Sequence, residues 1–513
     1  MRCIGKMALF ALFATGCAKF GVSDPGDAGP IIDQSQDEAF SMEVGTPSPV
    51  VQGQTVTVPV TLTRSGSTRS DVAITITGAP SGVASSELVI TQSRDTGNLV
   101  IAVDGSVAQG PINGITVQAH AIYGGMATAS TSLPQLFVRG PAGSLDTTFG
   151  TGGRTILPGV PARSYNIFVS ADDNIFVYGS CSGAMGPICA SRLTPNGIPD
   201  TTYGVAGVAK LADLSIPYSS GSAAILRPDG TMVVGGGGPA YGVIPPDGKN
   251  IGAAIPLSTF NTAGIQLTGS VGSMALAPDG GIVMAFGSTI SGNSVIGIAK
   301  LTSTWLPDTG FGTGGFTSVG PQYVSSMDVA VRPNGKIVIG GSWYSPTANY
   351  MLQLDSKGAP DTTFGINGQV TTSSSPINLL ILPDDRIIVP TGGGITAYTA
   401  NGGIDGTFGT AGNLTVTQSY PEVFLDDQNR LLITTVTTGS LESVWRYLNT
   451  GVLDTSFGMN GWATFPPPTD FKPNTSGEGT AAARVQKDGR IILLCVGIGG
   501  EGAAGALVSR LWN

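Results

Sequence analysis

The string PDTTFGING at residues 360–368 decides the fold, because versions of it recur from residue 145 to near the C-terminus. Each version joins a turn-forming residue, an aromatic residue and closely spaced small residues. The other copies are LDTTFGTGG at 145–153, PDTTYGVAG at 199–207, PDTGFGTGG at 307–315, IDGTFGTAG at 404–412 and LDTSFGMNG at 453–461, with a degenerate copy, LSTFNTAG, at 257–264. The aromatic residues of successive copies lie 44–57 residues apart, which indicates a tandem repeat of about 50 residues.

A second string, a tight turn followed by an apolar run, accompanies the first. Its copies are DDNIFVYG at 172–179, PDGTMVVGG at 228–236, PDGGIVMAFG at 278–287, PNGKIVIGG at 333–341, PDDRIIVPTG at 383–392, DQNRLLITT at 427–435 and KDGRIILLCVG at 487–497. The third turn position is held by Asn174, Gly230, Gly280, Gly335, Asp385, Asn429 and Gly489. Gly, Asn and Asp are the residues that tolerate the positive φ of tight hairpins. The string therefore predicts a hairpin that leads into a central strand.

A third string precedes most copies of the first. It reads CASRL at 189–193, IGIAKL at 296–301, MLQLD at 351–355, VWRYL at 444–448 and LVSRL at 507–511. The first Asp string has no such segment before it, and the last such segment has no Asp string after it. The two ends of the repeat region therefore complete one unit. Seven units of about four short strands predict a seven-bladed β-propeller over residues 141–513; an open β-solenoid is the alternative.

The region before the repeats alternates with period two. Val56, Val58, Val60 and Leu62 alternate with Thr and Pro residues, and similar runs follow as far as about residue 121. Alternation of this kind marks strands with one buried face. We expect a β-sandwich over residues 40–140, so the whole chain is predicted to be all-β.

Both parts resemble modules of bacterial surface proteins. The D-T-T-F-G and P-D-G strings are similar to the delta-60 repeat family, and this resemblance covers residues 145–513. It implies a propeller-like, surface-exposed array and brings no established activity. The segment 40–140 resembles immunoglobulin-like surface modules more loosely.

The first residues resemble a lipoprotein export signal. Arg2 and Lys6 precede the apolar run 7–14, and Thr15 and Gly16 stand before Cys17. This pattern is similar to the bacterial lipoprotein box, which implies a signal peptide over 1–17 and a lipid on Cys17. An ordinary secretory signal is the alternative. The resemblance implies an outer-membrane or cell-surface location, with membrane contact through the lipid. Residues 18–39 contain acidic residues with Gly and Pro and show no apolar periodicity, so they predict a flexible acidic tether.

Composition excludes several functions. The chain has 513 residues, a net charge of −9 and a single histidine, His120. An acidic balance argues against nucleic acid as a partner, because phosphate binding needs a basic face. A lone histidine and the absence of hydrolase or zinc-protease strings leave no catalytic residue to name. We therefore expect no cofactor and no resident metal, while the oligomeric state stays open.

Two sets of residues have a predicted structural role. Cys181 and Cys189 flank a short turn, so an exported chain would join them in a disulfide, with free thiols as the alternative. The repeated aspartates are Asp146, Asp200, Asp308, Asp361, Asp405 and Asp454. We expect each carboxylate to accept backbone N–H groups of its own turn. A ring of calcium sites is the alternative, although one carboxylate per repeat is few for calcium.

The candidate ligand-binding residues are aromatic. The segment SWYSPTANY at 342–350 is predicted to be a polar loop that carries Trp343, Tyr344 and Tyr350. Such rings stack on sugars or anchor a protein, unless they pack between blades. The expected function is a lipid-anchored, non-catalytic protein that binds a protein or polysaccharide, or acts as a scaffold. A polysaccharide hydrolase or lyase with channel carboxylates is one alternative, and a purely structural component is another.

Overall fold

The structure is a computed structural model. It describes residues 38–513 apart from 67–68, 123–126, 159–162, 182–185, 216–222, 237, 261–265, 291–292, 320–323, 345–346, 377, 392, 417–421, 437–441, 474–481 and 500–503. Within these residues the chain forms strands and turns, and its one helical element is the 3₁₀ turn η2 (Leu257–Thr259). The prediction of an all-β protein is therefore confirmed.

Residues 38–140, the N-terminal module, form two main sheets and a small third one. The first sheet has the order β1 (Ala39–Val44), β3 (Thr55–Ser65), β7 (Thr96–Val103) and β5 (Val83–Ser85). The second has the order β10 (Thr128–Ser132), β9 (Thr116–Ala121), β4 (Val72–Thr77) and β6 (Leu88–Ile90). The third joins β2 (Val50–Val51), β11 (Leu136–Arg139) and β8 (Gly110–Ile112). The predicted alternation is present in β3, where Val56, Val58, Val60 and Leu62 are buried in one shared core.

Seven sheets follow in the described part of the repeat region. Sheet 1 is β13 (Arg163–Val169), β14 (Ile175–Ser180), β15 (Pro187–Leu193) and β16 (Val208–Ser215). Sheet 2 is β17 (Ala224–Leu226), β18 (Met232–Gly235), β19 (Ala240–Ile244) and β20 (Ile255–Pro256). Sheet 3 is β21 (Gln266–Leu276), β22 (Ile282–Ile290), β23 (Asn293–Leu301) and β24 (Phe316–Val319). Sheet 4 is β25 (Val324–Val331), β26 (Ile337–Tyr344), β27 (Thr347–Leu354) and β28 (Gln369–Thr372).

Sheets 5 and 6 also follow the order of the chain, whereas sheet 7 combines strands from both ends of the repeat region. Sheet 5 is β29 (Leu380–Ile381), β30 (Ile387–Thr391), β31 (Gly394–Tyr398) and β32 (Asn413–Thr415). Sheet 6 is β33 (Glu422–Leu425), β34 (Leu431–Val436), β35 (Glu442–Tyr447) and β36 (Trp462–Phe465). Sheet 7 joins β12 (Arg154–Pro158), β40 (Ala504–Leu511) and β39 (Ile491–Gly499), and β39 also pairs with β37 (Phe471–Pro473) and β38 (Ala482–Val485).

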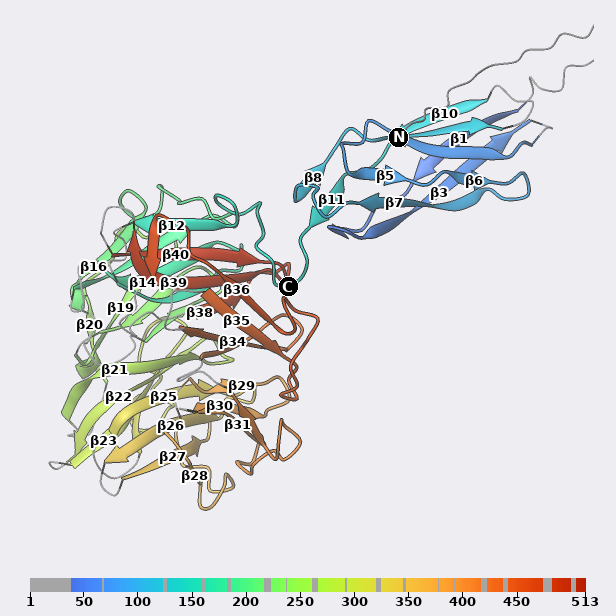
Figure 1. The fold of residues 1–513 in the computed structure, drawn as a ribbon. Coiled ribbons are helices and arrows are strands. Elements are labelled where there is room, and N and C mark those ends of the chain that lie inside the picture. Colours follow the sequence, from blue (N-terminus) through green and yellow to red (C-terminus); the bar gives the residue numbers. More distant parts are fainter. Residues whose placement is uncertain are drawn as a thin grey trace, which may run out of the picture.

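The seven sheets form a closed ring (Figure 1). Seven hydrophobic clusters each contain residues of two successive sheets, and one of them joins sheet 7 to sheet 1. Sheet 7 combines both ends of the repeat region, because β12 pairs antiparallel with β40 and Leu145 bridges Leu511. This is the closure that the sequence predicts. No sheet can bury its two faces alone, so packing in a ring supplies the core.

The hairpins after the first strand of each sheet have the predicted backbone. The turn residues Gly230, Gly280, Gly335, Asp385, Asn429 and Gly489 all have positive φ, from 59° to 85°. In the first copy the prediction is wrong by one residue, because Asp173, with a φ of 60°, occupies this position in place of Asn174. The pairing of Val169 with Ile175 and the bond from Ser170 N–H to Asn174 O set this register, so Asp173 corresponds to the residue with positive φ in the other turns.

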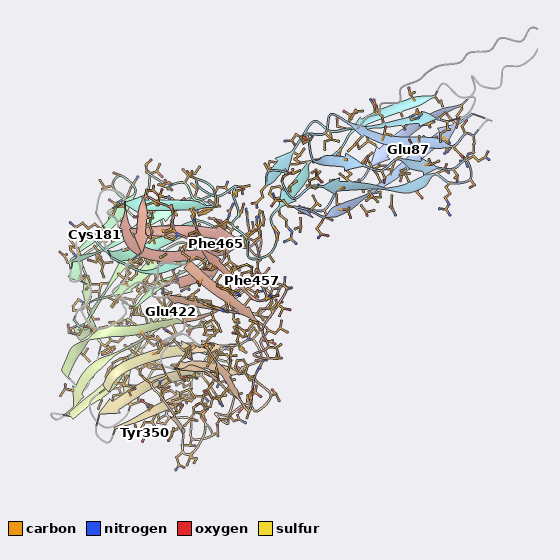
Figure 2. The ribbon with its side chains drawn as sticks, in the orientation of Figure 1. Glu87, Cys181, Tyr350, Glu422, Phe457 and Phe465 are labelled. Atoms are coloured by element: carbon orange, nitrogen blue, oxygen red, sulfur yellow. A yellow bond between two sulfur atoms is a disulfide. The ribbon has the colours of Figure 1, made fainter. Side chains whose placement is uncertain are left out.

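The N-terminal module attaches to sheet 7 at the end that carries the Asp strings. Trp512 Nε1 donates to Gln109 Oε1 at 2.9 Å, and the Trp512 ring lies edge-on to Phe137. Gln109 Oε1 also accepts from Thr147 N–H at 2.8 Å, inside the first Asp string. The second-to-third-strand hairpins of the sheets lie at the other end of the strands, because connections alternate ends in an antiparallel meander. Figure 2 shows this separation between Cys181 and Phe457.

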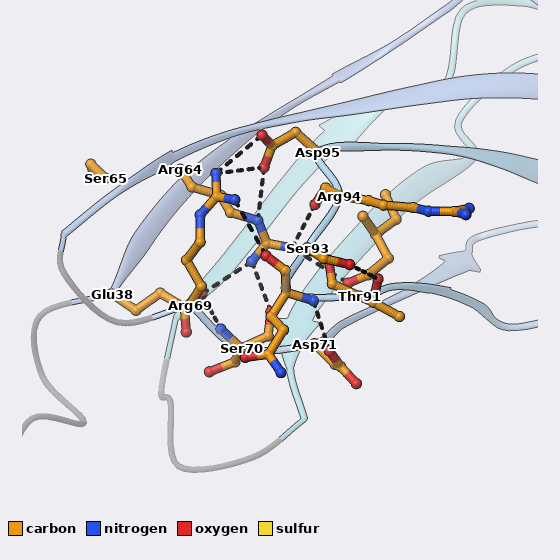
Figure 3. A network of polar contacts seen from close by, with 12 residues as sticks. Glu38, Arg64, Ser65, Arg69, Ser70, Asp71, Thr91, Ser93, Arg94 and Asp95 are labelled. Carbon is orange, nitrogen blue, oxygen red and sulfur yellow. Dashed lines mark hydrogen bonds and ion pairs between the residues drawn. The ribbon is translucent and has the colours of Figure 1, made fainter.

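A buried ion-pair network holds the first described residue of the module (Figure 3). Arg64, with 3% of its side chain exposed, pairs with Glu38 at 3.1 Å and with Asp95 at 3.1 Å. Arg64 also donates to Ser70 O at 2.8 Å, and Glu38 accepts from Ser70 N–H at 2.8 Å. The network therefore fixes the point at which the chain enters the module.

Candidate functional site

Each repeated aspartate uses its Oδ1 atom inside its own turn. In five of the copies Oδ1 accepts from the backbone N–H and the hydroxyl of the residue two positions later: Thr148, Thr202, Thr363, Thr407 and Ser456. In the sixth, Asp308 accepts from Gly310 N–H. This is the turn-stabilising role that the sequence analysis expected, and it explains the Thr or Ser of the string.

The Oδ2 atoms of the repeated aspartates form ion pairs with Lys and Arg side chains. The sequence patterns did not predict these pairs. Four cations come from the third string: Arg192 to Asp200, Lys300 to Asp308, Arg446 to Asp454 and Arg510 to Asp146, at 2.7–3.0 Å. In sheets 4 and 5 this string carries Gln353 and Ala397, and the hairpin supplies Lys336 to Asp361 and Arg386 to Asp405. Every described copy with an Asp thus has a cation from one of two positions, and Asp146 and Asp454 have one from each.

The pairing of the backbone explains these ion pairs. Asp200 N–H donates to Arg192 O, and the same bond joins Asp308 to Lys300 and Asp454 to Arg446. Each bond places the two side chains side by side on one face. The signal that could have found them is the basic residue before the last Leu of CASRL, IGIAKL and LVSRL.

Arginines in this region also reach the next sheet of the ring. Guanidinium groups donate to carbonyl oxygens in the next turn at five joints: Arg510 to Pro195, Arg192 to Pro246, Arg227 to Ser303, Arg332 to Ala400 and Arg386 to Asn449, at 2.7–3.0 Å. In parallel, glycine N–H groups of the Asp strings donate to the adjacent carbonyls at six joints: Gly150 to Asn196, Gly204 to Asp247, Gly312 to Lys357, Gly365 to Asn401, Gly409 to Thr450 and Gly458 to Ala142. The Asp string is therefore a joint between sheets as well as a turn.

The aromatic residue of the string presses on a glycine of the next turn. Phe311 is 1% exposed, and a Cβ added to Gly358, whose φ is +87°, would lie 2.9 Å from its ring. The joint between sheets 2 and 3 differs. There Trp305, with a φ of 68°, takes the place of this glycine, and Arg227 lies 4.6 Å from the Trp305 ring. The side chain fits because the degenerate copy sends Phe260 toward Gly315 instead.

The charges of the joints are strongly coupled to their surroundings. The hydrogen bond from Thr202, aided by the charge of Arg192, lowers the pKa of Asp200 despite burial. The hydrogen bonds from Lys336 and Thr363 lower the pKa of Asp361 in the same way. These carboxylates already have protein donors, and within the described residues no three His, Cys, Asp or Glu side chains gather as a metal site requires.

The other predicted site residues lie on the opposite end of the sheets. A disulfide joins Cys181 to Cys189, with 5.3 Å between their Cα atoms, next to the turn between β14 and β15. The predicted loop at 342–350 is wrong in extent, because Trp343 and Tyr344 end β26 and Tyr350 lies within β27. Trp343 pairs with Ala348 and Tyr344 with Thr347. Tyr350 is half-buried against the core between sheets 3 and 4, so it is further from the tip than expected.

A second group of buried charges crosses the joint between sheets 6 and 7. Glu442, 5% exposed on β35, accepts from Ser509 Oγ and pairs with Arg154 at 3.4 Å. Burial raises the pKa of Glu442 to about 7, because Arg154 and Ser509 offset only part of the lost hydration. Burial raises the pKa of the nearby Cys495 thiol to about 12. No pattern in the sequence pointed to this group.

One comparison with known proteins, a family match, agrees with the architecture. The family described as "Domain of unknown function (DUF5122) beta-propeller" matches residues 332–364, which run from the hairpin of sheet 4 to the aromatic residue of its Asp string. No curated protein matches the chain. Among solved structures, a protein of unknown function from Porphyromonas gingivalis W83 is 12% identical over 42% of this chain and 96% of its own, with a TM-score of 0.17. The prediction of a β-propeller is confirmed. No helix of the described residues has the length and hydropathy to cross a membrane.

The first prediction concerns the contribution of the Asp–cation pairs to the free energy of unfolding. Asp146→Asn keeps the shape of the side chain but leaves Arg510 and Arg490 facing a neutral group in a site with no exposure. We expect the free energy of unfolding to fall by about 3–5 kcal/mol in urea titrations. The matched control is Asp308→Asn, whose side chain is 28% exposed and pairs with Lys300, and it should cost about 0–1 kcal/mol. Equal losses in both variants would contradict the role of burial.

The second prediction concerns pH. Folded Glu442 holds its proton more tightly than the unfolded chain does, so its contribution to stability is present below pH 4.5 and is lost as pH rises through 7, by about 3 kcal/mol. Glu442→Gln cannot ionise, so the fall in unfolding free energy between pH 4.5 and 7 should become shallower. The exposed Glu87→Gln serves as the control and should keep the wild-type slope. An unchanged slope in Glu442→Gln would refute the assignment.

Proposed function

We propose that this chain is a lipid-anchored, non-catalytic surface protein in which a seven-bladed propeller presents a binding face away from the membrane. In this proposal the seven sheets are the blades, the repeats are of the delta-60 type and residues 40–140 are an immunoglobulin-like spacer. The lipid on Cys17 and a tether over 18–39 connect the spacer to an outer membrane or cell surface.

One observation carries the proposal: the N-terminal module is bound to the Asp-string end of the ring, through Gln109 and Trp512. The opposite end, with the Cys181–Cys189 disulfide and the β26–β27 hairpin, is therefore left for a partner (Figure 2). The buried Glu38–Arg64 pair supports a mechanical role of the module, because it fixes the point at which a tether would pull (Figure 3). A rigid spacer would hold the binding face at a constant distance from the anchor.

The β26–β27 hairpin is the proposed contact with ligand. Trp343 and Tyr344 occupy the last two positions of β26, next to the hairpin turn, and aromatic rings at such tips stack on sugar rings. We therefore take a polysaccharide as the first ligand to test, with Tyr350 as a residue that supports the hairpin from the core.

The anchor is tested by metabolic labelling with palmitate in a bacterial host. Wild-type protein should be labelled and should fractionate with membranes, whereas Cys17→Ala should lose the label. Cys495→Ala is the matched control and should stay labelled, because this thiol lies in the propeller. A mature chain that begins elsewhere and carries no lipid would favour the ordinary secretory signal.

The binding face is tested on a glycan array with the purified chain. The wild type should bind at least one class of polysaccharide, and Trp343→Ala combined with Tyr344→Ala should weaken that binding at least tenfold, because the stacking surface is removed. Val205→Ser is the control, since Val205 is 83% exposed on the Asp-string end. Binding that survives the double substitution, or no binding by the wild type, would overturn the polysaccharide assignment.

A further inference from the structure

A cluster of polar and aromatic residues lies on the first strands of sheets 6, 7 and 1. First strands of neighbouring sheets contact one another, as β33 does β38 and β38 does β13, so they line the axis of the ring. The axial cluster consists of Glu422 and Phe424 on β33, Arg484 on β38, and Asn166 and Phe168 on β13. Figure 2 labels Glu422 in the middle of the propeller, away from its rim.

The strand register places these side chains together. The last residue of each first strand pairs across the hairpin with the first residue of the second strand: Val169 with Ile175, Leu425 with Leu431 and Val485 with Ile491. Asn166 and Glu422 stand three residues before this point, and Phe168, Phe424 and Arg484 one residue before it. Positions two apart on a strand share a face, so all five side chains belong to one face of their strands.

The guanidinium group of Arg484 is held in a fixed plane. Its Cζ lies 4.8 Å from the ring centre of Phe424 and 5.5 Å from that of Phe168. Nη1 donates to Ala483 O at 2.7 Å, and Nη2 donates to Asn166 Oδ1 at 3.0 Å. An arginine has five N–H donors, so three stay unused by any described residue. These donors belong to a side chain that is half-buried.

Glu422 is the complement of this cation without touching it. No described residue gives its carboxylate a hydrogen bond or an ion pair within bonding distance, and the side chain is half-buried. The field of Arg484 lowers the pKa of Glu422, but burial prevails and raises it to about 7. Burial also lowers the pKa of Arg484 to about 10. Both groups have therefore lost hydration without gaining each other as a direct partner, which is costly unless a third group bridges them.

A second acidic residue on the first strands shows the difference. Asp328 on β25 accepts from Ser273 Oγ and from the N–H groups of Leu379 and Val329, so its carboxylate is satisfied by the protein itself. Asp328 is therefore satisfied without a ligand, whereas no described residue satisfies Glu422 or the three remaining donors of Arg484.

We propose that the axial cluster binds a small molecule that carries a carboxylate next to a hydrogen-bond donor, with the carboxylate on Arg484 and the donor on Glu422. A planar guanidinium group matches a carboxylate with two parallel N–H donors, and a hydroxyl or ammonium group satisfies the carboxylate of Glu422. An acidic sugar and an α-amino acid are two sources of this chemistry. The site is independent of the hairpin face proposed above, because it lies on other strands.

Isothermal titration calorimetry on the purified full-length chain tests the site at constant ionic strength. The probes are sodium glucuronate and glycine, with acetate as the carboxylate without a donor and glucose as the hydroxyl compound without a carboxylate. We expect one of the first two to bind at a 1:1 ratio and at least tenfold more tightly than acetate, and glucose not to bind. Which of the two binds identifies the source. Failure of both, or equal binding of acetate, overturns the proposal.

Variants assign the binding to the two charged groups. Arg484→Gln should abolish binding, and Arg484→Lys should weaken it at least tenfold, because an ammonium group lacks the paired donors. Glu422→Gln should remove most of the preference over acetate. Lys487→Gln is the matched control, since Lys487 is exposed three residues further along the same segment, and it should bind as the wild type does. The circular dichroism spectrum and thermal midpoint of each variant show whether it is folded. Binding that persists in folded Arg484→Gln or Arg484→Lys overturns the proposal.

Discussion

The ring depends on a shared set of hydrogen bonds at the joints between sheets. A glycine N–H of one Asp string donates to a carbonyl of the next turn, and an arginine that faces an aspartate donates to the neighbouring carbonyl. A turn carbonyl buried without a donor would cost about 1–3 kcal/mol, so each sheet needs its neighbour to be satisfied. The ring therefore gains cooperativity from its turns as well as from the hydrophobic clusters between its sheets.

At three joints a repeated aspartate orients the arginine that reaches the next turn: Arg192, Arg386 and Arg510. Arg192 spans two sheets only because Asp200 holds its Nε at 2.8 Å, which leaves Nη1 to reach Pro246 O at 2.8 Å. The Thr at the second position after the aspartate occupies the other oxygen, so the carboxylate cannot rotate away. A lone carboxylate in such a turn would have no reason to recur. A carboxylate that positions a cation between neighbouring sheets has a reason to recur. Because only the position of the cation matters, the cation can come from either of two sequence positions.

Closure and the hairpin turns could be predicted from the sequence because both follow from patterns that recur in each repeat. The hairpin residues are restricted to Gly, Asn and Asp by backbone sterics, and a missing strand at each end of the repeats implies a shared sheet. The shift from Asn174 to Asp173 arose because Asp and Asn both tolerate positive φ, and only the pairing of Val169 with Ile175 decides which of the two occupies the turn position.

Long-range polar partners could not be predicted in this way. Arg484 stands in the string AAARVQKDG, and nothing there indicates that Asn166, 318 residues away, would meet its guanidinium group. Likewise, no sequence pattern links Glu442 to Arg154, which lies 288 residues away in the chain. Both contacts join sheet 7 to a neighbouring sheet, so they form only when the ring closes and cannot be inferred from local sequence. The aromatic tip was misjudged for a different reason, because Ser-Pro in its middle suggested a loop where the strands run to the turn.

A repeat protein can build a site only where the repeats stop being alike. Positions equivalent to Glu422 hold Ala223 and Ala482 in sheets 2 and 7, and the position of Arg484 holds Ile225 in sheet 2, so these charges are not part of the repeat. Selection for the fold alone would favour apolar residues there, since burial of an unpaired charge destabilises the ring. Departures at the joint of Trp305 are compensated by the altered place of Phe260, and Asp328 is compensated by Ser273 and backbone donors. Arg484 is compensated only in part, by Ala483 O, Asn166 Oδ1 and two aromatic rings, and no described residue pairs with the carboxylate of Glu422. The axial cluster therefore holds polar groups that the repeat does not require and that the proposed ligand would satisfy.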